Sequence, residues 1–360
     1  MKLNILHISP DFNYSCGRSY YAFLLLKYLK QKKHEVLLVT NKGDSLERLD
    51  DFGIPYILKS SIHSKSLLSF PKNINFVSNL IKEYKINIIH TYHRYSELVA
   101  VQAARLNRKR KVKTVFTSLS IVNRKYNVEF KSDKVIAISY TIKNMLLDKF
   151  KVKKDRLILI PNFTDTDELN ELETLAEGAQ DDGNFFNVLS IGRFHTDKNF
   201  ETLLTALNLL NDNTVKLVLV GEGDLLENYR SYIKKNKLNV EIVSPQKNLL
   251  HYFLSANACV LPSNRDPFPS FMLQSGLHKK PFIGANVDGI AELIRNNFNG
   301  LLFDNKSPLE LAYKIYQFKT DKALAHKCAS NLYNKVVNRY TQEFIAPKIE
   351  KLYKELAKPD

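Results

Sequence analysis

Two basic residues stand five positions apart across a turn in the second half of the chain. Ile191, Gly192 and Arg193 end an apolar run, and Lys198 with Asn199 opens a helical pattern. A guanidinium and an ammonium at this spacing can converge on a diphosphate, helped by the positive end of the following helix. Taken alone, such a pair is most often just surface charge, so its interpretation depends on what else shares the pattern.

A second polar cluster strengthens the phosphate interpretation. Asp266 precedes a helical pattern, and Gln274 lies eight residues later, inside it. This spacing places a carboxylate on the loop before a helix and an amide within that helix, both facing one pocket. Farther along, residues 288–292 read Asp-Gly-Ile-Ala-Glu.

Short apolar runs that alternate with helical patterns supply the frame for these residues. In the first half we predict strands at residues 3–8, 36–39, 86–90, 112–117 and 135–139, and helices at 19–30, 96–106 and 141–150. In the second half we predict strands at residues 186–191, 215–220, 240–243, 258–262 and 281–285, and helices at 200–210, 224–235, 308–317, 322–340 and 343–356. This alternation is typical of parallel βαβ units.

The chain therefore reads as an α/β protein with two doubly wound, Rossmann-like domains. A polar, acidic stretch from residue 165 to 184 marks the linker. We predict a first domain over residues 1–175, a second over 176–335, and a helical segment over 336–360 that packs back on the first. Ligands of such domains bind at the carboxyl ends of the strands, here in the cleft that two facing domains would form.

The charge of the chain is unevenly distributed. The 360 residues carry 53 Lys and Arg against 37 Asp and Glu, a net charge of +16, yet residues 1–170 alone account for +15. A basic lobe attracts a membrane surface, an anionic substrate or nucleic acid. Helix-turn-helix, zinc and RNA-binding signatures are missing from the sequence, which disfavours nucleic acid.

Composition excludes several other classes of protein. With 44% hydrophobic residues the chain is globular rather than disordered. Three scattered cysteines suit neither a disulfide framework nor a zinc site. No run approaches the roughly 18 apolar residues of a membrane span, and the N-terminus lacks the features of a signal peptide. We expect a cytoplasmic protein.

The stretch from Gly192 to Leu302 resembles the donor-binding domain of glycosyltransferase family 4, the retaining enzymes of the GT-B fold with a group 1 transferase domain. The order and spacing of the family's motifs hold over this stretch. The matching residues are Gly192-Arg193, Lys198-Asn199, Pro262-Ser263-Asn264-Arg265-Asp266-Pro267-Phe268, Gln274, Asp288-Gly289-Ile290-Ala291-Glu292 and Asn299-Gly300-Leu301-Leu302. A weaker likeness extends over the first half, through Gly17, residues 132–139 and residues 160–162.

The resemblance implies a role for each matching residue. Arg193 and Lys198 would hold the diphosphate of a nucleotide-sugar and stabilise its leaving charge, so that no metal and no cofactor is needed. Asp266 would contact the donor sugar, and Gln274 the ribose hydroxyls. The remaining residues on the donor side are Gly17, Gly192, Asn199, Phe268, Pro269, Ser270 and Glu292.

The sequence departs from the family pattern at four positions. Asp266 and Gln274 replace two glutamates, and Asp288 replaces a glycine. Leu119 stands where relatives have an active-site histidine, so His93 is the best imidazole left near a strand's carboxyl end, with an ordinary loop histidine as the alternative. Retaining transfer by front-face attack needs no strong enzymic base, because the departing phosphate oxygen can take the acceptor proton.

The resemblance and the charge together predict a bacterial transferase for lipopolysaccharide or capsule assembly. The enzyme would move a hexose-type sugar from a UDP-linked donor to a lipid-linked or polysaccharide acceptor, at the inner face of the cytoplasmic membrane. Anionic acceptor or lipid would meet a basic surface formed by Arg18, Arg94, Arg108, Lys109, Arg110 and Lys111. The alternative is a catalytically degenerate GT-B protein that acts as a binding or scaffold subunit of a glycan-assembly complex.

Overall fold

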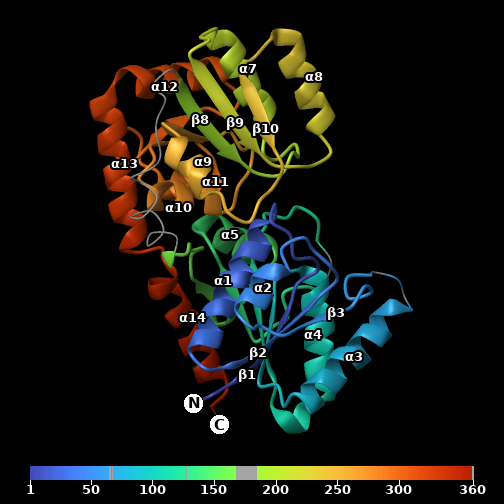
Figure 1. Cartoon of the computed structure of the whole chain (residues 1–360). Coiled ribbons are helices and arrows are strands. Elements are labelled where there is room, and N and C mark those ends of the chain that lie inside the picture. Colours follow the sequence, from blue (N-terminus) through green and yellow to red (C-terminus); the bar gives the residue numbers. More distant parts are fainter. Residues whose placement is uncertain (65, 67, 126–127, 168–184, 359–360) are drawn as a thin grey trace. The chain divides into compact units, whose positions relative to one another are not determined.

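The computed structural model describes residues 1–64, 66, 68–125, 128–167 and 185–358. The chain divides into two compact units (Figure 1). Unit 1 comprises Met1–Asn162 and Gln342–Asp360, and unit 2 comprises Phe163–Thr341. The boundary expected between residues 175 and 176 lies outside the described residues.

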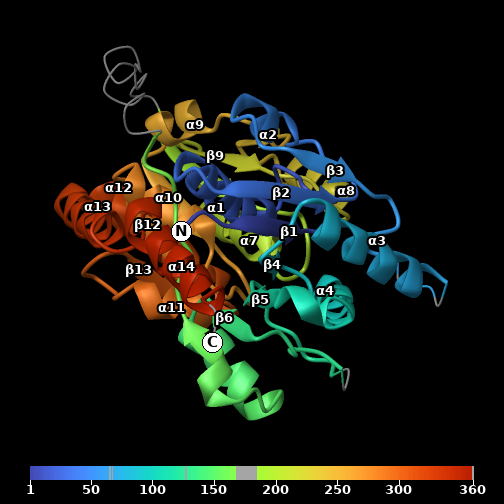
Figure 2. The ribbon, with the colours of Figure 1, turned by 90° about the horizontal axis from the view of Figure 1, so that it is seen from below.

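A seven-stranded parallel sheet forms the centre of unit 1. Its strands are β1 (Asn4–Ile8), β2 (Glu35–Thr40), β3 (Tyr56–Leu58), β4 (Ile88–Thr91), β5 (Lys113–Ser118), β6 (Lys134–Ala137) and β7 (Leu157–Leu159). Their order is β3-β2-β1-β4-β5-β6-β7, most of which can be followed in Figure 2. Leu6 in the central strand β1 pairs with Leu37 on one side and Ile89 on the other. Both faces of this strand are buried, as expected of a parallel sheet covered on both sides.

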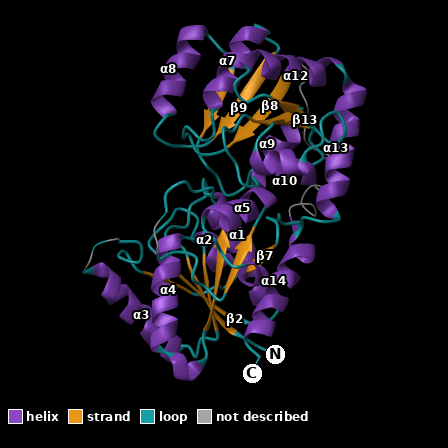
Figure 3. Cartoon of the chain, turned by 180° about the vertical axis from the view of Figure 1, so that it is seen from behind, coloured by secondary structure: helices purple, strands orange, loops and turns teal. Residues whose placement is uncertain are grey.

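Helices flank the strands of unit 1 (Figure 3). They are α1 (Gly17–Gln31), α2 (Glu47–Asp51), α3 (Ser69–Glu83), α4 (Arg94–Leu106), α5 (Tyr140–Asn144) and α14 (Gln342–Leu356). Three shorter turns are the 3-10 turns η1 (Arg108–Arg110) and η3 (Lys154–Arg156) and the π-turn η2 (Met145–Lys149), which continues α5. Helix α14 packs against α1.

Helix α4 ends at Leu106, as predicted for the helix over residues 96–106, and the basic segment that follows it forms only a short 3-10 turn. Helix α4 ends at Leu106 because the Asn107 side chain donates to Ala103 O at 2.9 Å and to Ser78 Oγ at 2.7 Å. The 3-10 turn η1 follows, and Lys111 then adopts a left-handed conformation with φ 50° before β5 begins.

Unit 2 contains a six-stranded parallel sheet with the order β10-β9-β8-β11-β12-β13. The strands are β8 (Phe186–Ile191), β9 (Val215–Val220), β10 (Val240–Val243), β11 (Ala258–Leu261), β12 (Phe282–Ala285) and β13 (Leu301–Phe303). The helices are α7 (Phe200–Leu210), α8 (Leu226–Asn236), α9 (Leu250–Ser255), α10 (Ser270–Leu277), α11 (Asp288–Leu293), α12 (Pro308–Thr320) and α13 (Lys322–Val337). Local signals set some of these ends: Ser307 caps α12 by accepting from Glu310 N at 3.1 Å, and Pro308 follows it.

Two buried polar networks tie helix α14 to the rest of unit 1. In the first, the Tyr353 hydroxyl meets His90 Nδ1, and His90 Nε2 lies 2.7 Å from Thr117 Oγ1. In the second, Glu350 accepts from Tyr28 at 2.8 Å and from His34 Nε2 at 3.0 Å. Because His34 Nδ1 accepts from the backbone, its proton is on Nε2 and faces the carboxylate.

A second buried histidine stands beside His90. His7 lies on β1 in register with His90 on β4, and its Nδ1 is 2.6 Å from the Tyr92 hydroxyl. Burial lowers the pKa of His7 to about 3 and that of His90 well below 6.5. Both imidazoles are therefore neutral in the folded protein at neutral pH.

Because both histidines stay neutral in the folded protein, we predict that its free energy of unfolding decreases in mild acid. The unfolded chain takes up protons on both histidines below about pH 6.5, whereas the folded chain does not, so the free energy of unfolding falls as the pH drops from 6.5 towards 5. His7→Gln should reduce this slope by up to about 1.4 kcal/mol per pH unit. Urea unfolding at several pH values measures the slope. His326→Gln, at an exposed position on α13, is the control, and an unchanged slope in His7→Gln would contradict the prediction.

Candidate functional site

The turn between β8 and α7 carries the two cations singled out in the sequence. Gly192 and Arg193 follow β8 directly, and Phe194 anchors the turn by packing its buried ring against Phe200. Arg193 is exposed, and its side chain has no hydrogen-bond or ion-pair partner among the described residues. The stem of Lys198 lies over Gly192, where a β-carbon would come within 3.5 Å of Lys198 Cδ.

Lys198 is paired with Asp266. The ammonium lies 2.5 Å from Asp266 Oδ2, and the Asp266 side chain is only 5% exposed. The pair joins the turn after β8 to the loop after β11, which are neighbouring strands of the sheet. The structure thus brings together two residues that the sequence assigned to one site, at the carboxyl edge where ligands of such sheets bind.

The backbone of Asp266 is held as firmly as its side chain. Its N–H donates to Asp288 Oδ2 at 3.1 Å, and its carbonyl accepts from Gly289 N at 3.0 Å. Gly289 allows this approach, since a β-carbon there would lie 2.0 Å from Pro267 O. Asp288 takes a left-handed conformation with φ 41°, a region that glycine occupies more readily. Burial raises the pKa of the Asp288 carboxyl.

Asn199 links the same two loops. Its side-chain amide donates to Pro262 O and to Asn305 O, each at 3.2 Å. Its backbone is left-handed, with φ 53°, just before α7 begins. The side chain that the resemblance places on the donor side therefore also fixes the geometry of the site.

The other donor-side residues of unit 2 gather on α10 and α11. Pro269 precedes α10, Ser270 is its first residue, and the backbone N–H groups of that first turn lack intrahelical partners. Gln274 is half-buried within α10, and its side-chain amide makes no hydrogen bond in the described part of the chain. Phe268 is buried against the Tyr340 ring, and Glu292 is half-buried on α11.

In unit 1, the first predicted site residues follow β1. Gly17 is exposed and is the first residue of α1. The neighbouring Arg18 makes a two-pronged ion pair with Asp11, at 2.7 Å to both carboxylate oxygens. Asp11 thus balances the charge of the Arg18 guanidinium, which we had expected to meet an anionic acceptor or lipid.

Two further predicted residues follow β4. His93 caps α4, with Nδ1 accepting from Tyr95 N at 3.2 Å, and its ring packs on His63 at a centroid distance of 4.1 Å. Arg94 donates to Glu129 at 2.6 Å and to Arg124 O at 2.8 Å. Both residues stand near the carboxyl edge of the sheet, as expected, but each has a structural partner there.

Four predicted basic residues lie elsewhere. Arg108, Lys109 and Arg110 form η1 and Lys111 follows it, all exposed. Sequence reasoning grouped them with Arg18 and Arg94, but they follow the C-terminus of α4, whereas Arg94 opens that helix. Sequence reasoning also treated Asp288 only as a departure from the family, although its contact with the Asp266 backbone gives it a definite place in the site.

Two family models cover nearly all of the chain. The model of the glycosyl transferases group 1 matches residues 173–335, and that of glycosyltransferase family 4 matches residues 17–168. The chain belongs to the family 4 glycosyltransferases. The predicted fold class is confirmed, since both units of this glycosyltransferase are Rossmann-like and solved structures of GT-B transferases match it.

Several known proteins resemble this glycosyltransferase over most of their length. An Escherichia coli UDP-Gal:alpha-D-GlcNAc-diphosphoundecaprenol alpha-1,3-galactosyltransferase is 22% identical, with 88% of each chain covered. The Staphylococcus aureus capsular polysaccharide biosynthesis glycosyltransferase CapM is 21% identical, with 92% of this chain and 93% of that one covered. The crystal structure of Anabaena HepE in complex with UDP-glucose has a TM-score of 0.85 at 18% identity, covering 98% and 100% of the two chains.

The described residues contain neither a candidate membrane span nor a candidate metal-ion cluster. None of the helices there combines the length and the apolar content that crossing a bilayer requires. Clusters of three or more His, Cys, Asp or Glu suited to a metal ion are likewise missing from that part of the chain.

The contact between Asp288 and the Asp266 backbone can be tested by substitution. Asp288→Ala removes the acceptor and places alanine in a left-handed conformation, so the free energy of unfolding should fall by about 1–3 kcal/mol. Asp288→Asn is the matched control, because asparagine tolerates this conformation and its amide oxygen can accept the same bond. Urea unfolding measures both. Equal stability of the two variants would show that the contact contributes nothing.

Proposed function

We propose that this glycosyltransferase transfers a hexose-type sugar from a UDP-linked donor to a lipid-linked or surface-polysaccharide acceptor, with retention of configuration and without a metal ion. One observation carries the proposal: the Lys198 ammonium lies 2.5 Å from Asp266, and the turn of Lys198 also carries Arg193, which has no ion-pair partner among the described residues. The turn offers two cations to a diphosphate, and Asp266, on the loop after β11, offers a carboxylate to the sugar attached to it.

The names of the relatives support a UDP-linked sugar as the donor and a lipid-linked or polysaccharide acceptor. The E. coli relative is named for UDP-Gal and for a diphosphoundecaprenol acceptor, and CapM is named for capsular polysaccharide biosynthesis. HepE was solved with UDP-glucose. The alpha-1,3 linkage in the name of the E. coli relative fits a retaining reaction on an α-linked donor.

In the proposed reaction the bond between the sugar C1 and the diphosphate oxygen breaks while the acceptor hydroxyl oxygen bonds to C1 on the same face. The hydroxyl proton passes to the departing phosphate oxygen, and UDP leaves. Arg193 and Lys198 stabilise the charge that develops on this oxygen, which is the largest catalytic contribution we assign. Asp266 orients the donor sugar while it aligns Lys198, and Gln274 binds the ribose.

The charge of unit 1 supports a peripheral position on an anionic membrane. Unit 1 carries 34 Lys and Arg against 16 Asp and Glu, a net charge of +18, whereas unit 2 has a net charge of −2. Each cation close to an anionic bilayer contributes about 1 kcal/mol of attraction. A lipid-linked acceptor would be presented at that surface.

The donor assignment predicts the outcome of a thermal-shift screen followed by turnover. Among UDP-, GDP-, ADP- and CMP-linked sugars, a UDP-sugar should raise the melting temperature, because binding to the folded state stabilises it. Lys198→Ala should lower transfer or donor hydrolysis by about a hundredfold or more, the scale seen when one charge-stabilising group is removed.

Lys234→Ala, which removes an exposed lysine of α8 in the same unit, is the matched control and should retain full activity. Full activity in both Lys198→Ala and Arg193→Ala would exclude a role for these two cations in binding the diphosphate. Donor binding without turnover on any acceptor would instead favour the non-catalytic binding subunit.

Metal independence is tested separately. EDTA should leave the transfer rate unchanged, because the two cations take the place of a divalent ion on the diphosphate. Rates measured in EDTA, with and without added Mg²⁺ or Mn²⁺, decide the point. Loss of activity in EDTA that either ion restores would show that a metal takes part.

A further inference from the structure

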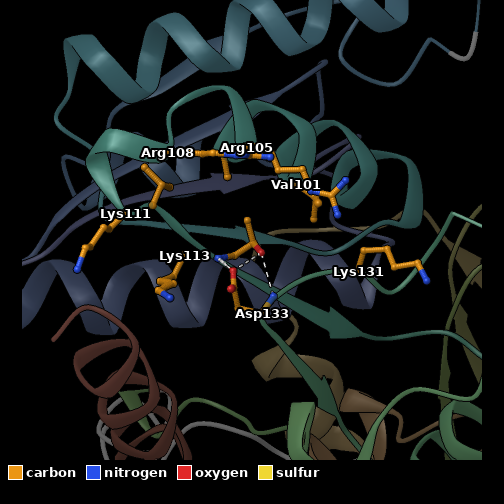
Figure 4. Close-up of a pocket in the computed structure, with 10 residues that line it drawn as sticks. Val101, Arg105, Arg108, Lys111, Lys113, Lys131 and Asp133 are labelled. Carbon is orange, nitrogen blue, oxygen red and sulfur yellow. Dashed lines mark hydrogen bonds between the residues drawn. The ribbon is translucent and has the colours of Figure 1, made fainter. Parts of the chain in front are cut away.

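A basic pocket opens in unit 1 at the C-terminal end of α4. It encloses about 350 Å³, and five of its lining residues are cationic, namely Arg105, Arg108, Lys111, Lys113 and Lys131. Figure 4 shows Lys111 and Lys131 at opposite ends of the pocket, with Asp133 between them. The lining comes from three places in the sequence: the end of α4 with η1, the start of β5 and the segment before β6.

Most of this positive charge has no counter-charge among the residues that the structure describes. Asp133 is the single acidic lining residue, and its Oδ2 already accepts from Thr114 N at 2.8 Å and from Thr114 Oγ1 at 2.7 Å. In the described part of the chain, no carboxylate forms an ion pair with Arg105, Arg108, Lys113 or Lys131. The α4 C-terminus attracts cations, but its half-charge is small beside five of them. The pocket therefore attracts an external anion.

The pocket is separate from the predicted site residues Gly17 and His93 of unit 1, although Arg108 and Lys111 in its lining belong to the basic surface predicted to meet an anionic acceptor or lipid. Its residues stand where β5 begins and just before β6, at the amino edge of the parallel sheet. Gly17 and His93 follow β1 and β4, at the carboxyl edge. A six-residue strand such as β5 spans roughly 17 Å, which separates the two edges. A group bound in the pocket therefore takes no part in the transfer itself.

An apolar side chain stands beside the pocket. Leu106, between Arg105 and Arg108 along the chain, is 65% exposed. Lys109 and Arg110 extend the positive charge beyond the lining. Cations that surround a hollow, with an exposed leucine next to them, suit a phosphate held at the surface of a lipid layer.

We propose that this pocket binds the terminal phosphate of an anionic membrane lipid. A phosphomonoester has three free oxygens and a charge between −1 and −2, so it can accept from several donors at once. A phosphodiester headgroup has two free oxygens and a single charge. The inference rests on the membrane association proposed above. Beyond the general attraction between a basic unit and an anionic bilayer, it assigns one specific site for a lipid headgroup.

The test compares two lipids on two variants that lose the same charge. Vesicles of phosphatidylcholine with phosphatidic acid, or with phosphatidylglycerol adjusted to equal zeta potential, are sedimented with the full chain. The pocket variant is Arg105→Gln with Arg108→Gln. The control is Lys109→Gln with Arg110→Gln, which removes two cations from the same segment but none from the pocket lining. Circular dichroism verifies that both variants are folded.

The wild type should bind phosphatidic acid about fivefold or more tightly than phosphatidylglycerol, the effect of one additional charge-assisted hydrogen bond. The control should bind both lipids more weakly with its preference intact, and the pocket variant should lose the preference. Two results would overturn the proposed phosphate site while leaving the membrane association in place. One is the same lipid preference in both variants, and the other is no lipid preference in the wild type. No vesicle binding by the wild type would overturn both.

A calorimetric titration with inorganic phosphate, at ionic strength held constant with chloride, separates the two sources of phosphate. Weak heats that disappear in the pocket variant would agree with a lipid headgroup as the ligand. Tight binding of inorganic phosphate, combined with no preference among vesicles, would overturn the lipid assignment in favour of a soluble phosphate.

Discussion

The close approach of two loops in unit 2 is the constraint on which the candidate site depends. Parallel strands deliver their carboxyl ends to one edge, so the turn after β8 and the loop after β11 meet there. The ion pair between Lys198 and Asp266 and the amide of Asn199 hold these segments together. Glycines let other segments approach each of these two loops closely. Besides Gly289, Gly221 has no room for a β-carbon, which would lie 2.0 Å from Gly192 O.

The replacement of glutamate by aspartate at position 266 becomes understandable in this setting. The shorter side chain reaches Lys198 at hydrogen-bonding distance while its backbone is held at both the N–H and the carbonyl. Asp288, at a position where relatives have glycine, supplies one of those two backbone contacts. The two substitutions therefore act on a single residue and are better understood as a matched pair than as separate departures.

Sequence reasoning succeeded where a local pattern reports on local structure. Apolar runs predicted most of the strands, and the motif from Gly192 to Leu302 predicted the family. It failed where long-range contacts decide: the pairing of Arg94 depends on Glu129, 35 residues away. Strand β3 and helix α3 were not predicted, and the polar loops beside β3 gave no periodic signal. The contact between Asp288 and Asp266 crosses 22 residues and leaves no trace in spacing.

The attachment of α14 to unit 1 has a consequence for the order in which the protein is made. The sheet of unit 1 is synthesised first, but His90 and His34 find Tyr353 and Glu350 only after all of unit 2 has been translated. Domains generally fold as they emerge from the ribosome, so unit 2 is complete before unit 1 can bury its last polar groups. Until α14 has been synthesised, the surface of the nascent first half that packs against this helix, beside α1, therefore remains uncovered.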